Sequence, residues 1–157
     1  MSIAVDNVVA NNVAMLRCIN ERSLPVKFDA KFYEGAVEAK DLCYLGFYEE
    51  IPVGGIRCEL VMPEGAKNAD NAAAKLYIMS LAVLPAYRRH GIGSLLLSKV
   101  VEVCREKKVH EIVIHVSVEN EDALAWYKKR GFEQTGTLEG YYKQLSNTKA
   151  AVLVKKV

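Results

Sequence analysis

The sequence predicts an α/β fold in which a mixed sheet of six to seven strands is flanked by helices. Segments of strand-like composition alternate along the chain with segments whose apolar residues follow helical spacing. The chain has 157 residues, of which 51% are hydrophobic. That length is enough for one substantial core and leaves little room for a second domain. We therefore expect residues 1–157 to form a single domain.

The first half of the chain predicts an edge strand, two helices and a hairpin. A rough helical pattern covers residues 8–20 and is interrupted at Pro25. Asp29 is a preferred N-cap residue and predicts a second, short helix after it. Residues 63–74 are small and polar and predict a mobile surface loop. The strands expected here cover residues 3–5, 42–48 and 53–61.

The second half repeats the alternation. A helix is expected over residues 94–107, and another begins after Asn120, which can cap it, and ends at Gly131. Pro85 cannot donate to a sheet, so the strand before it should end near Val83. The strands expected in this half cover residues 74–83, 111–118, 132–137 and 150–155.

A basic turn with two glycines joins the strand at 74–83 to the helix at 94–107. Because Gly91 and Gly93 lack a Cβ, the backbone can turn tightly and bring several N–H groups to an anion. The start of the helix adds its positive end. Neither GxxxxGK(S/T) nor GxGxxG is present. The pattern predicts a pyrophosphate-binding turn, with an ordinary strand-to-helix turn as the alternative.

The turn also carries a family resemblance. Arg88-x-x-Gly91-x-Gly93 resembles the acyl-CoA-binding signature of the GNAT superfamily of N-acetyltransferases. Further similar segments extend the resemblance to the NatE-type (San) N-terminal α-acetyltransferases over nearly the whole chain; they are residues 76–81, 85–89, 114–116, 120–133 and 141–142.

The resemblance implies a GNAT fold with acetyl-CoA as co-substrate. In that fold the strands at 74–83 and 111–118 run parallel and splay apart at their C-terminal ends to admit the pantetheine arm. The first strand contributes mainly backbone groups, and one N–H polarises the acetyl carbonyl. The coenzyme-binding residues implied in this chain are Leu81, Ala82, Val83, Arg88, Arg89, His90, Gly91, Ile92, Gly93, Ser94, Asn120 and Tyr127.

Acetyl transfer needs a neutral amine, because an ammonium group has no lone pair for the attack. The resemblance maps Tyr77 and His115 onto the family's catalytic pair, which acts through an ordered water. A free imidazole titrates near pH 6.5 and a phenol near pH 10. We therefore expect His115 to be the base and Tyr77 its water-positioning partner. The alternative is that both residues only pack within or on the sheet.

The implied peptide site lies in two segments. Leu24, Pro25 and Val26 match the family's apolar pocket for the first side chain of the substrate, and the tyrosine pair 141–142 matches the pair that closes over the peptide. A packed surface loop is the alternative for that pair. The family has Phe at position 24 and Tyr at position 28, so Leu24 changes the pocket shape and Phe28 lacks a hydroxyl. The full expected set is Leu24, Pro25, Val26, Phe28, Tyr77, Met79, His115, Tyr141 and Tyr142.

The resemblance implies as substrate a peptide or nascent-chain N-terminus, with a retained methionine followed by an apolar residue. It implies subunits of a NatA-like complex as partners. Two alternatives stay open: acetylation of lysine side chains or small amines, and a non-catalytic adaptor role in such a complex. Gly91, Gly93, Tyr77 and His115 are all present, which favours an enzyme.

Composition and charge argue against several other classes of protein. The net charge is +2 and the basic residues form small clusters, so we expect no direct binding to nucleic acid. We see neither a signal sequence nor a membrane span, and we expect the cytosol, with the nucleus as an open alternative. The four cysteines are widely spaced in apolar segments, which predicts buried free thiols and no metal.

Overall fold

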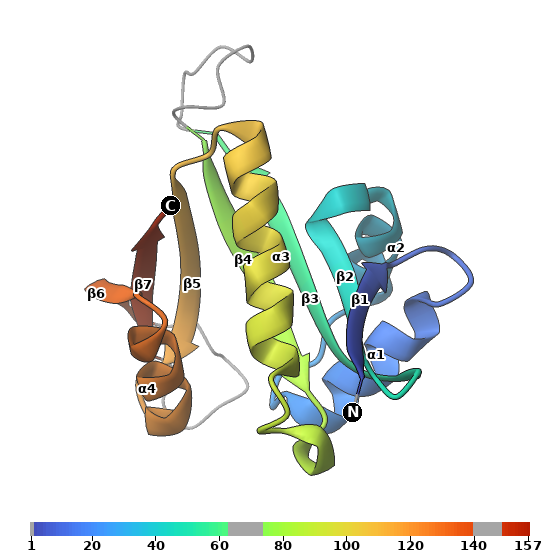
Figure 1. Ribbon diagram of the computed structural model, residues 1–157. Helices are drawn as coiled ribbons and strands as arrows, with labels where there is room; N and C mark the ends of the chain where they lie inside the picture. The colour runs from blue at the N-terminus through green and yellow to red at the C-terminus, as the bar shows by residue number, and fades with distance from the viewer. Residues whose placement is uncertain (1, 63–73, 140–148) are drawn as a thin grey trace. The chain divides into compact units, whose positions relative to one another are not determined.

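The computed structural model describes residues 2–62, 74–139 and 149–157. The described residues form a seven-stranded sheet in the order β1-β2-β3-β4-β5-β7-β6 and four α-helices (Figure 1). The β4 and β5 strands pair in parallel, whereas the β1–β2, β2–β3, β5–β7 and β6–β7 pairs are antiparallel. The predicted mixed α/β fold is confirmed, with seven strands.

The elements follow the expected order, with boundaries that differ by a few residues at most positions. The strands are β1 (Ile3–Asn7), β2 (Cys43–Tyr48), β3 (Ile51–Val61), β4 (Lys75–Val83), β5 (Glu111–Ser117), β6 (Glu133–Leu138) and β7 (Ala150–Lys156). The helices are α1 (Val13–Ser23), α2 (Ala30–Glu38), α3 (Ile92–Lys107) and α4 (Glu121–Lys129). Short 3₁₀ turns cover Lys40–Leu42 and Pro85–Tyr87.

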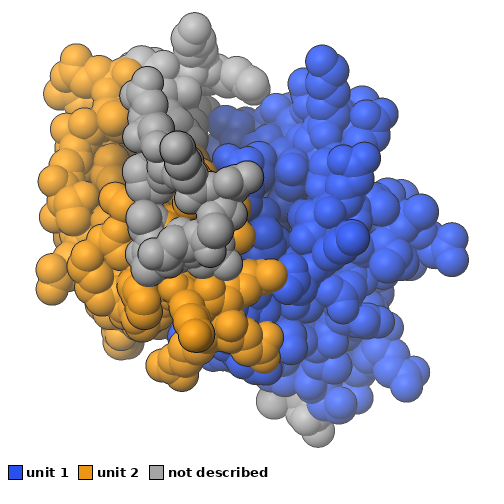
Figure 2. All heavy atoms as spheres, turned by 90° about the horizontal axis from the view of Figure 1, so that it is seen from above, with its two compact units in different colours: residues 1–59, 79–103 blue, residues 60–78, 104–157 orange. Residues whose placement is uncertain are grey.

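The chain divides into two compact units, coloured separately in Figure 2. The first unit comprises residues 1–59 and 79–103, and the second comprises residues 60–78 and 104–157. Both β4 and α3 therefore contribute residues to each unit. The single domain expected from the length stays a prediction.

In the first unit, two glycines allow α3 to begin directly on the strands. A Cβ at Gly46 would lie 2.7 Å from Cγ2 of Ile92, and one at Gly54 would lie 3.0 Å from the same atom. Real Cβ contacts are rarely that short, so any larger residue would push away the first turn of α3. Ile92 and Leu96 are buried as a result. This close contact fixes where the N-terminus of α3 lies within the unit.

The α1 helix begins at Val13, so the expectation of a helix from residue 8 is wrong. The N–H of Val8 instead donates to the carbonyl of Cys43, at 3.2 Å. Asn12 closes the turn before α1, because its Oδ1 accepts from the N–H of Val9 at 2.8 Å and its Nδ2 donates to the carbonyl of Asn7 at 3.1 Å. These bonds compete with helical hydrogen bonding and delay the helix start.

The second unit is built around β5, whose burial alternates along the strand. Ile112, Ile114 and Val116 are buried, and the residues between them are half-buried. The parallel register with β4 comprises two pairs, Leu76 with Ile112 and Tyr77 with Val113. On its other side β5 pairs with β7 along its whole length.

The α4 helix has the two predicted ends. Asn120 caps its start, since its Oδ1 accepts from the N–H of Ala123 at 3.1 Å. Gly131, with φ of 93°, follows its last turn in the left-handed conformation that glycine adopts most easily. Lys155 on β7 adds a hydrogen bond of 2.7 Å to the carbonyl of Arg130. The end of α4 is thus tied to the neighbouring strand.

The cysteine expectation is confirmed at three positions and wrong at one. Cys43, Cys58 and Cys104 are free and buried, whereas Cys18, on α1, is free but exposed. Burial raises the pKa of the Cys43 thiol to about 12 and that of Cys104 to about 11. The Cys43 and Cys104 thiols are therefore neutral at physiological pH.

Three other expectations concern absences or masked residues. The loop predicted over 63–74 lies almost entirely outside the described residues. Within the described ranges, no three or more His, Cys, Asp or Glu residues are grouped as a metal site would require. No helix in the described part of the chain has both the length and the apolarity needed to cross a membrane.

Candidate active site

The predicted catalytic pair lies together in the second unit. The Oη of Tyr77 on β4 is 3.1 Å from Nδ1 of His115 on β5, and the two ring centroids are 4.9 Å apart with the planes at 66°. Both side chains are half-buried. The hydroxyl donates to Nδ1 when that nitrogen is unprotonated, and accepts from it otherwise. The two groups can therefore exchange a proton directly.

Burial favours the neutral form of His115. It lowers the pKa of His115 from its usual value of 6.5, because the imidazolium form loses hydration. His115 is therefore mainly neutral at physiological pH and has a lone pair available. A neutral imidazole in contact with a phenol hydroxyl is suited to accept a proton.

The predicted anion-binding turn lies in the first unit, and of its two glycines only Gly91 has a left-handed backbone, whereas Gly93 lies within the first turn of α3. Gly91 has φ of 82° and Arg89 has φ of 68°, both in the left-handed region. The first helical bond of α3 runs from the N–H of Leu95 to the carbonyl of Gly91, at 2.9 Å. The N–H groups that precede it open the N-terminal end of α3. Successive N–H groups at a helix start form a site for an anion.

Aromatic packing supports the turn within the same unit. The ring of Tyr48 on β2 lies 4.8 Å from the ring of His90 and 5.6 Å from that of Tyr87. Arg88 is held by a hydrogen bond to the end of β4, as its Nε donates to the carbonyl of Val83 at 3.1 Å. Tyr48 was missed by sequence reasoning, because no local pattern connects a residue of β2 to this turn.

The β4 strand, which precedes the turn, carries further residues expected at the coenzyme and peptide sites. Leu81 and Val83 are half-buried and Ala82 is buried, in the alternating pattern of β4. The N–H of Leu84 donates to the carbonyl of Val53 at 2.8 Å, so β3 lies along this end of β4. Met79 packs against the core of the first unit.

The expected first-side-chain pocket is also in the first unit, between α1 and α2. Leu24 and Phe28 are partly buried against the core of the unit, while Pro25 is exposed and Val26 half-buried. The ring of Phe28 stacks on that of Phe32 with centroids 4.0 Å apart and planes at 14°. The stack gives Phe28 a fixed place at the start of α2. The expected tyrosines, Tyr141 and Tyr142, lie outside the described residues.

The two remaining coenzyme candidates belong to the second unit. Asn120 caps α4 as described above. Tyr127 is buried, with its ring edge-on to Trp126 at 4.9 Å and to Phe132 at 5.2 Å. These contacts show a packing role for Tyr127 and a capping role for Asn120. The structure thus brings the candidates into two local groups, a proton-transfer pair in one unit and an anion-binding turn with an apolar segment in the other.

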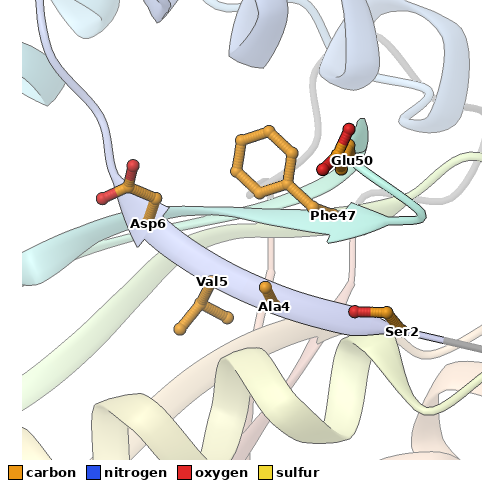
Figure 3. A pocket seen from close by; sticks show the side chains of 6 residues that line it. All are labelled: Ser2, Ala4, Val5, Asp6, Phe47 and Glu50. Carbon is orange, nitrogen blue, oxygen red and sulfur yellow. The ribbon is translucent and has the colours of Figure 1, made fainter.

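A cavity of about 340 Å³ on β1 and β2 contains none of the predicted site residues. Its lining residues are Ser2, Ala4, Val5, Asp6, Phe47 and Glu50. In Figure 3 the Asp6, Phe47 and Glu50 side chains point to the same side of the strands and Val5 to the other. The cavity is therefore separate from the chemistry predicted from the sequence.

Comparisons with known proteins give the family of the chain. The acetyltransferase (GNAT) family model matches residues 12–132. N-alpha-acetyltransferase 50 of Danio rerio is 33% identical over 99% of this chain and 89% of that protein, and the probable N-acetyltransferase san of Drosophila melanogaster is 35% identical over 98% and 80%. The structure of Arabidopsis thaliana Naa50 in complex with the bisubstrate analogue CoA-Ac-MVNAL has a TM-score of 0.88 and 37% identity, with all of both chains covered. On these grounds the chain belongs to the acetyltransferase (GNAT) family.

Proposed function

We propose that this chain transfers the acetyl group of acetyl-CoA to the α-amino group of protein N-termini, with a preference for a retained methionine followed by an apolar residue. The observation that carries the proposal is the 3.1 Å contact between Tyr77 Oη and His115 Nδ1 in a GNAT-family chain. Two relatives that match at least 98% of this chain are named an N-alpha-acetyltransferase and a probable N-acetyltransferase. The analogue bound by the Arabidopsis relative joins coenzyme A through an acetyl group to a peptide beginning with Met-Val.

Proton removal is the step assigned to the Tyr77–His115 pair. A water between the substrate ammonium and the pair carries the proton to the hydroxyl of Tyr77, which passes its own proton to Nδ1 of His115. The freed amine then forms the N–C bond as the C–S bond breaks; coenzyme A leaves as the thiolate and takes up the further proton that the nitrogen loses as the amide forms. His115 is the base, and Tyr77 positions the water and relays the proton.

The acidity of the amine favours an N-terminus over a lysine. An α-amino group has a pKa near 8, so freeing it at pH 7 costs about 1 kcal/mol, whereas a lysine with a pKa near 10.4 costs about 4 to 5 kcal/mol. A half-buried neutral histidine with a lowered pKa is a modest base. Such a base is suited to the smaller cost, that of deprotonating an α-amino group.

The anion-binding turn is assigned to the pyrophosphate of acetyl-CoA. Gly91 is exposed, and among the described residues a Cβ at this position would meet only Cδ1 of Ile3, at 3.7 Å. The space in front of the turn is thus open to a ligand, and Arg88 and Arg89 add positive charge beside it. When bound, acetyl-CoA supplies the activated acetyl group. We assign the backbone of residues 81–83 and the side chains of Asn120 and Tyr127 to contacts with the pantetheine arm of acetyl-CoA.

The apolar segment between α1 and α2 is assigned to the first side chain of the substrate. Leu24, Pro25 and Val26 offer only apolar side chains, which accept methionine and exclude a charged residue through its desolvation cost. Phe28 extends this surface without a hydroxyl. The tyrosine pair 141–142 is assigned to the peptide backbone.

A matched peptide panel tests the proposal. Met-Leu, Ser-Ser and N-terminally blocked lysine peptides are incubated with acetyl-CoA, and the His115→Ala variant serves as the inactive control. We expect rapid turnover on Met-Leu and little on the others. Turnover on the blocked lysine peptide would move the function to side-chain acetylation. Silence on all three peptides would favour a non-catalytic adaptor.

From the resemblance to the NatE-type enzymes alone, we also propose that subunits of a NatA-like complex are partners. We further propose that the chain works in the cytosol, with the nucleus as the alternative. Affinity purification of the tagged chain tests the first point, with the His115→Ala variant as a control for substrate-dependent capture. Cell fractionation tests the second.

A further inference from the structure

Arg57 on β3 makes two contacts with one residue of α2. Its Nη1 donates to the carbonyl of Phe32 at 2.6 Å, and its guanidinium carbon lies 4.5 Å from the centroid of the Phe32 ring. A guanidinium group can do both, because it is planar and carries several N–H donors in that plane. The contact ties two segments that are 25 residues apart in the sequence.

Gly35 provides the space for this arrangement. A Cβ at Gly35 would lie 2.6 Å from Nη2 and 3.2 Å from Cζ of Arg57. Gly35 follows Phe32 by three residues on α2, so both lie on the same face of the helix. Glycine is a poor residue for a helix interior, and here its lack of a side chain allows the guanidinium to lie against the helix.

The contact continues from Phe32 to the segment at 24–28. The Phe32 ring stacks on Phe28 at 4.0 Å, and Phe28 immediately precedes Asp29, the cap of α2. The Asp29 carboxylate accepts from the N–H of Phe32 at 3.0 Å. Phe32 is therefore held through its ring, its N–H and its carbonyl. The position of Phe28 is in turn fixed by its stack on the Phe32 ring.

The charge on Arg57 is costly where it lies, which argues for a role. Its Nε is buried without a hydrogen-bond partner among the described residues. Cys43, which is opposite Arg57 in the β2–β3 register, has a thiol pKa raised to about 12 by burial and so provides no thiolate. An apolar side chain of similar size would avoid this desolvation cost.

We propose that Arg57 is a positioning residue for substrate selection, which holds Phe32 and thereby fixes Phe28 and the segment 24–28 that takes the first side chain of the substrate. The inference rests on the proposed function, since that function makes this segment the substrate pocket. Arg57 acts through Phe32 and Phe28, and its removal should change peptide recognition while leaving the proton-transfer pair intact.

Two variants and a matched control test the inference. Arg57→Lys keeps the charge and loses the planar group, and Gly35→Ala keeps Arg57 but displaces its guanidinium. Arg22→Lys makes the same exchange at an exposed arginine of α1. We expect the first two variants to raise the KM for a Met-Leu peptide about tenfold, with kcat and the KM for acetyl-CoA within about twofold of the wild type. Arg22→Lys should behave as the wild type.

Chemical rescue separates positioning from general loss of structure. Added guanidinium chloride at millimolar concentration should restore the peptide KM of Arg57→Ala, whereas ammonium chloride should not. If the wild type is active and Arg57→Lys has an unchanged KM for the peptide, this inference is overturned while the proposed function stands. Equal losses in kcat and in both KM values would also overturn it, as a merely structural role. A wild type silent on every peptide would remove the proposed function and this inference together.

Discussion

Replacement of Gly91 by alanine separates the two roles of the turn, its backbone conformation and its ligand contact. At φ of 82° an L-residue carries a strain of about 1–2 kcal/mol. The new methyl group adds no clash within the protein, since its nearest neighbour would be Cδ1 of Ile3 at 3.7 Å. For a chain of this size that strain lowers Tm by about 2–8 °C. Strain is present with and without ligand, so by itself it leaves the acetyl-CoA affinity unchanged.

The methyl group also occupies the space assigned to the pyrophosphate. We therefore expect Gly91→Ala to raise the Kd for acetyl-CoA about tenfold or more, equivalent to about 1.4 kcal/mol. The Kd is measured by isothermal titration calorimetry and Tm by scanning calorimetry. Gly131→Ala is the control for strain, because Gly131 has φ of 93° and follows α4; its new methyl group would also lie 2.7 Å from Nζ of Lys155, the end of a flexible side chain that must shift. Gly136→Ala is the unstrained control, since no atom of the described residues lies within 4 Å of its Cβ position, apart from its chain neighbours.

The two measurements give distinct outcomes. Both Gly91→Ala and Gly131→Ala should lower Tm, and only Gly91→Ala should weaken acetyl-CoA binding. An unchanged Kd in Gly91→Ala, with the expected fall in Tm, would refute the assignment of this turn to the pyrophosphate. A weakened Kd in Gly131→Ala would show that strain alone affects binding, and would refute the reasoning about the ligand space.

Three further predictions concern the second unit. His115→Ala should lower kcat about 10²- to 10⁴-fold with the Kd for acetyl-CoA within about twofold, measured by steady-state kinetics and calorimetry; an equal loss in both would contradict its role as the base. Because burial lowers the pKa of His115, the acid limb of the kcat/KM profile should lie below pH 6.5. For the same reason, the contribution of His115 to the free energy of unfolding should rise with pH between its lowered pKa and 6.5. An acid limb above pH 6.5 would exclude His115 as the titrating group. Asn120→Ala removes the cap bond to Ala123 and should cost about 1 kcal/mol in urea unfolding, and an unchanged stability would show that this bond contributes nothing.

The order of elements could be predicted because each has a local signature. Asn120 and Gly131 mark the ends of α4, and the glycine turn separates β4 from α3. The start of α1 could not be predicted in the same way. Val8 fits a helical spacing by itself, yet its N–H bonds to the carbonyl of Cys43, a partner that only the folded chain brings near. Tertiary hydrogen bonding overrides the local pattern here.

The same distinction applies to the candidate site. The turn at Gly91 and the Tyr77–His115 pair belong to motifs that can be recognised in the sequence. Arg57 and Tyr48 act through packing between segments far apart in the chain, and nothing near them in the sequence indicates a partner. One weak signal was present, namely Gly35 in the middle of a predicted helix. A glycine at such a position suggests a close neighbour, although it does not say which residue that is.

The contact between Tyr77 and His115 follows from sheet register and side-chain length together. Tyr77 is aligned with Val113, and His115 lies two residues further along β5 on the same face. Diagonal neighbours in a sheet are about 7–8 Å apart, a separation that aromatic side chains can span. A shift of one residue in either strand would place one ring on the opposite face and abolish the 3.1 Å contact. The catalytic assignment therefore depends on the β4–β5 register, which the two buried residues Leu76 and Ile112 hold by packing beside each other.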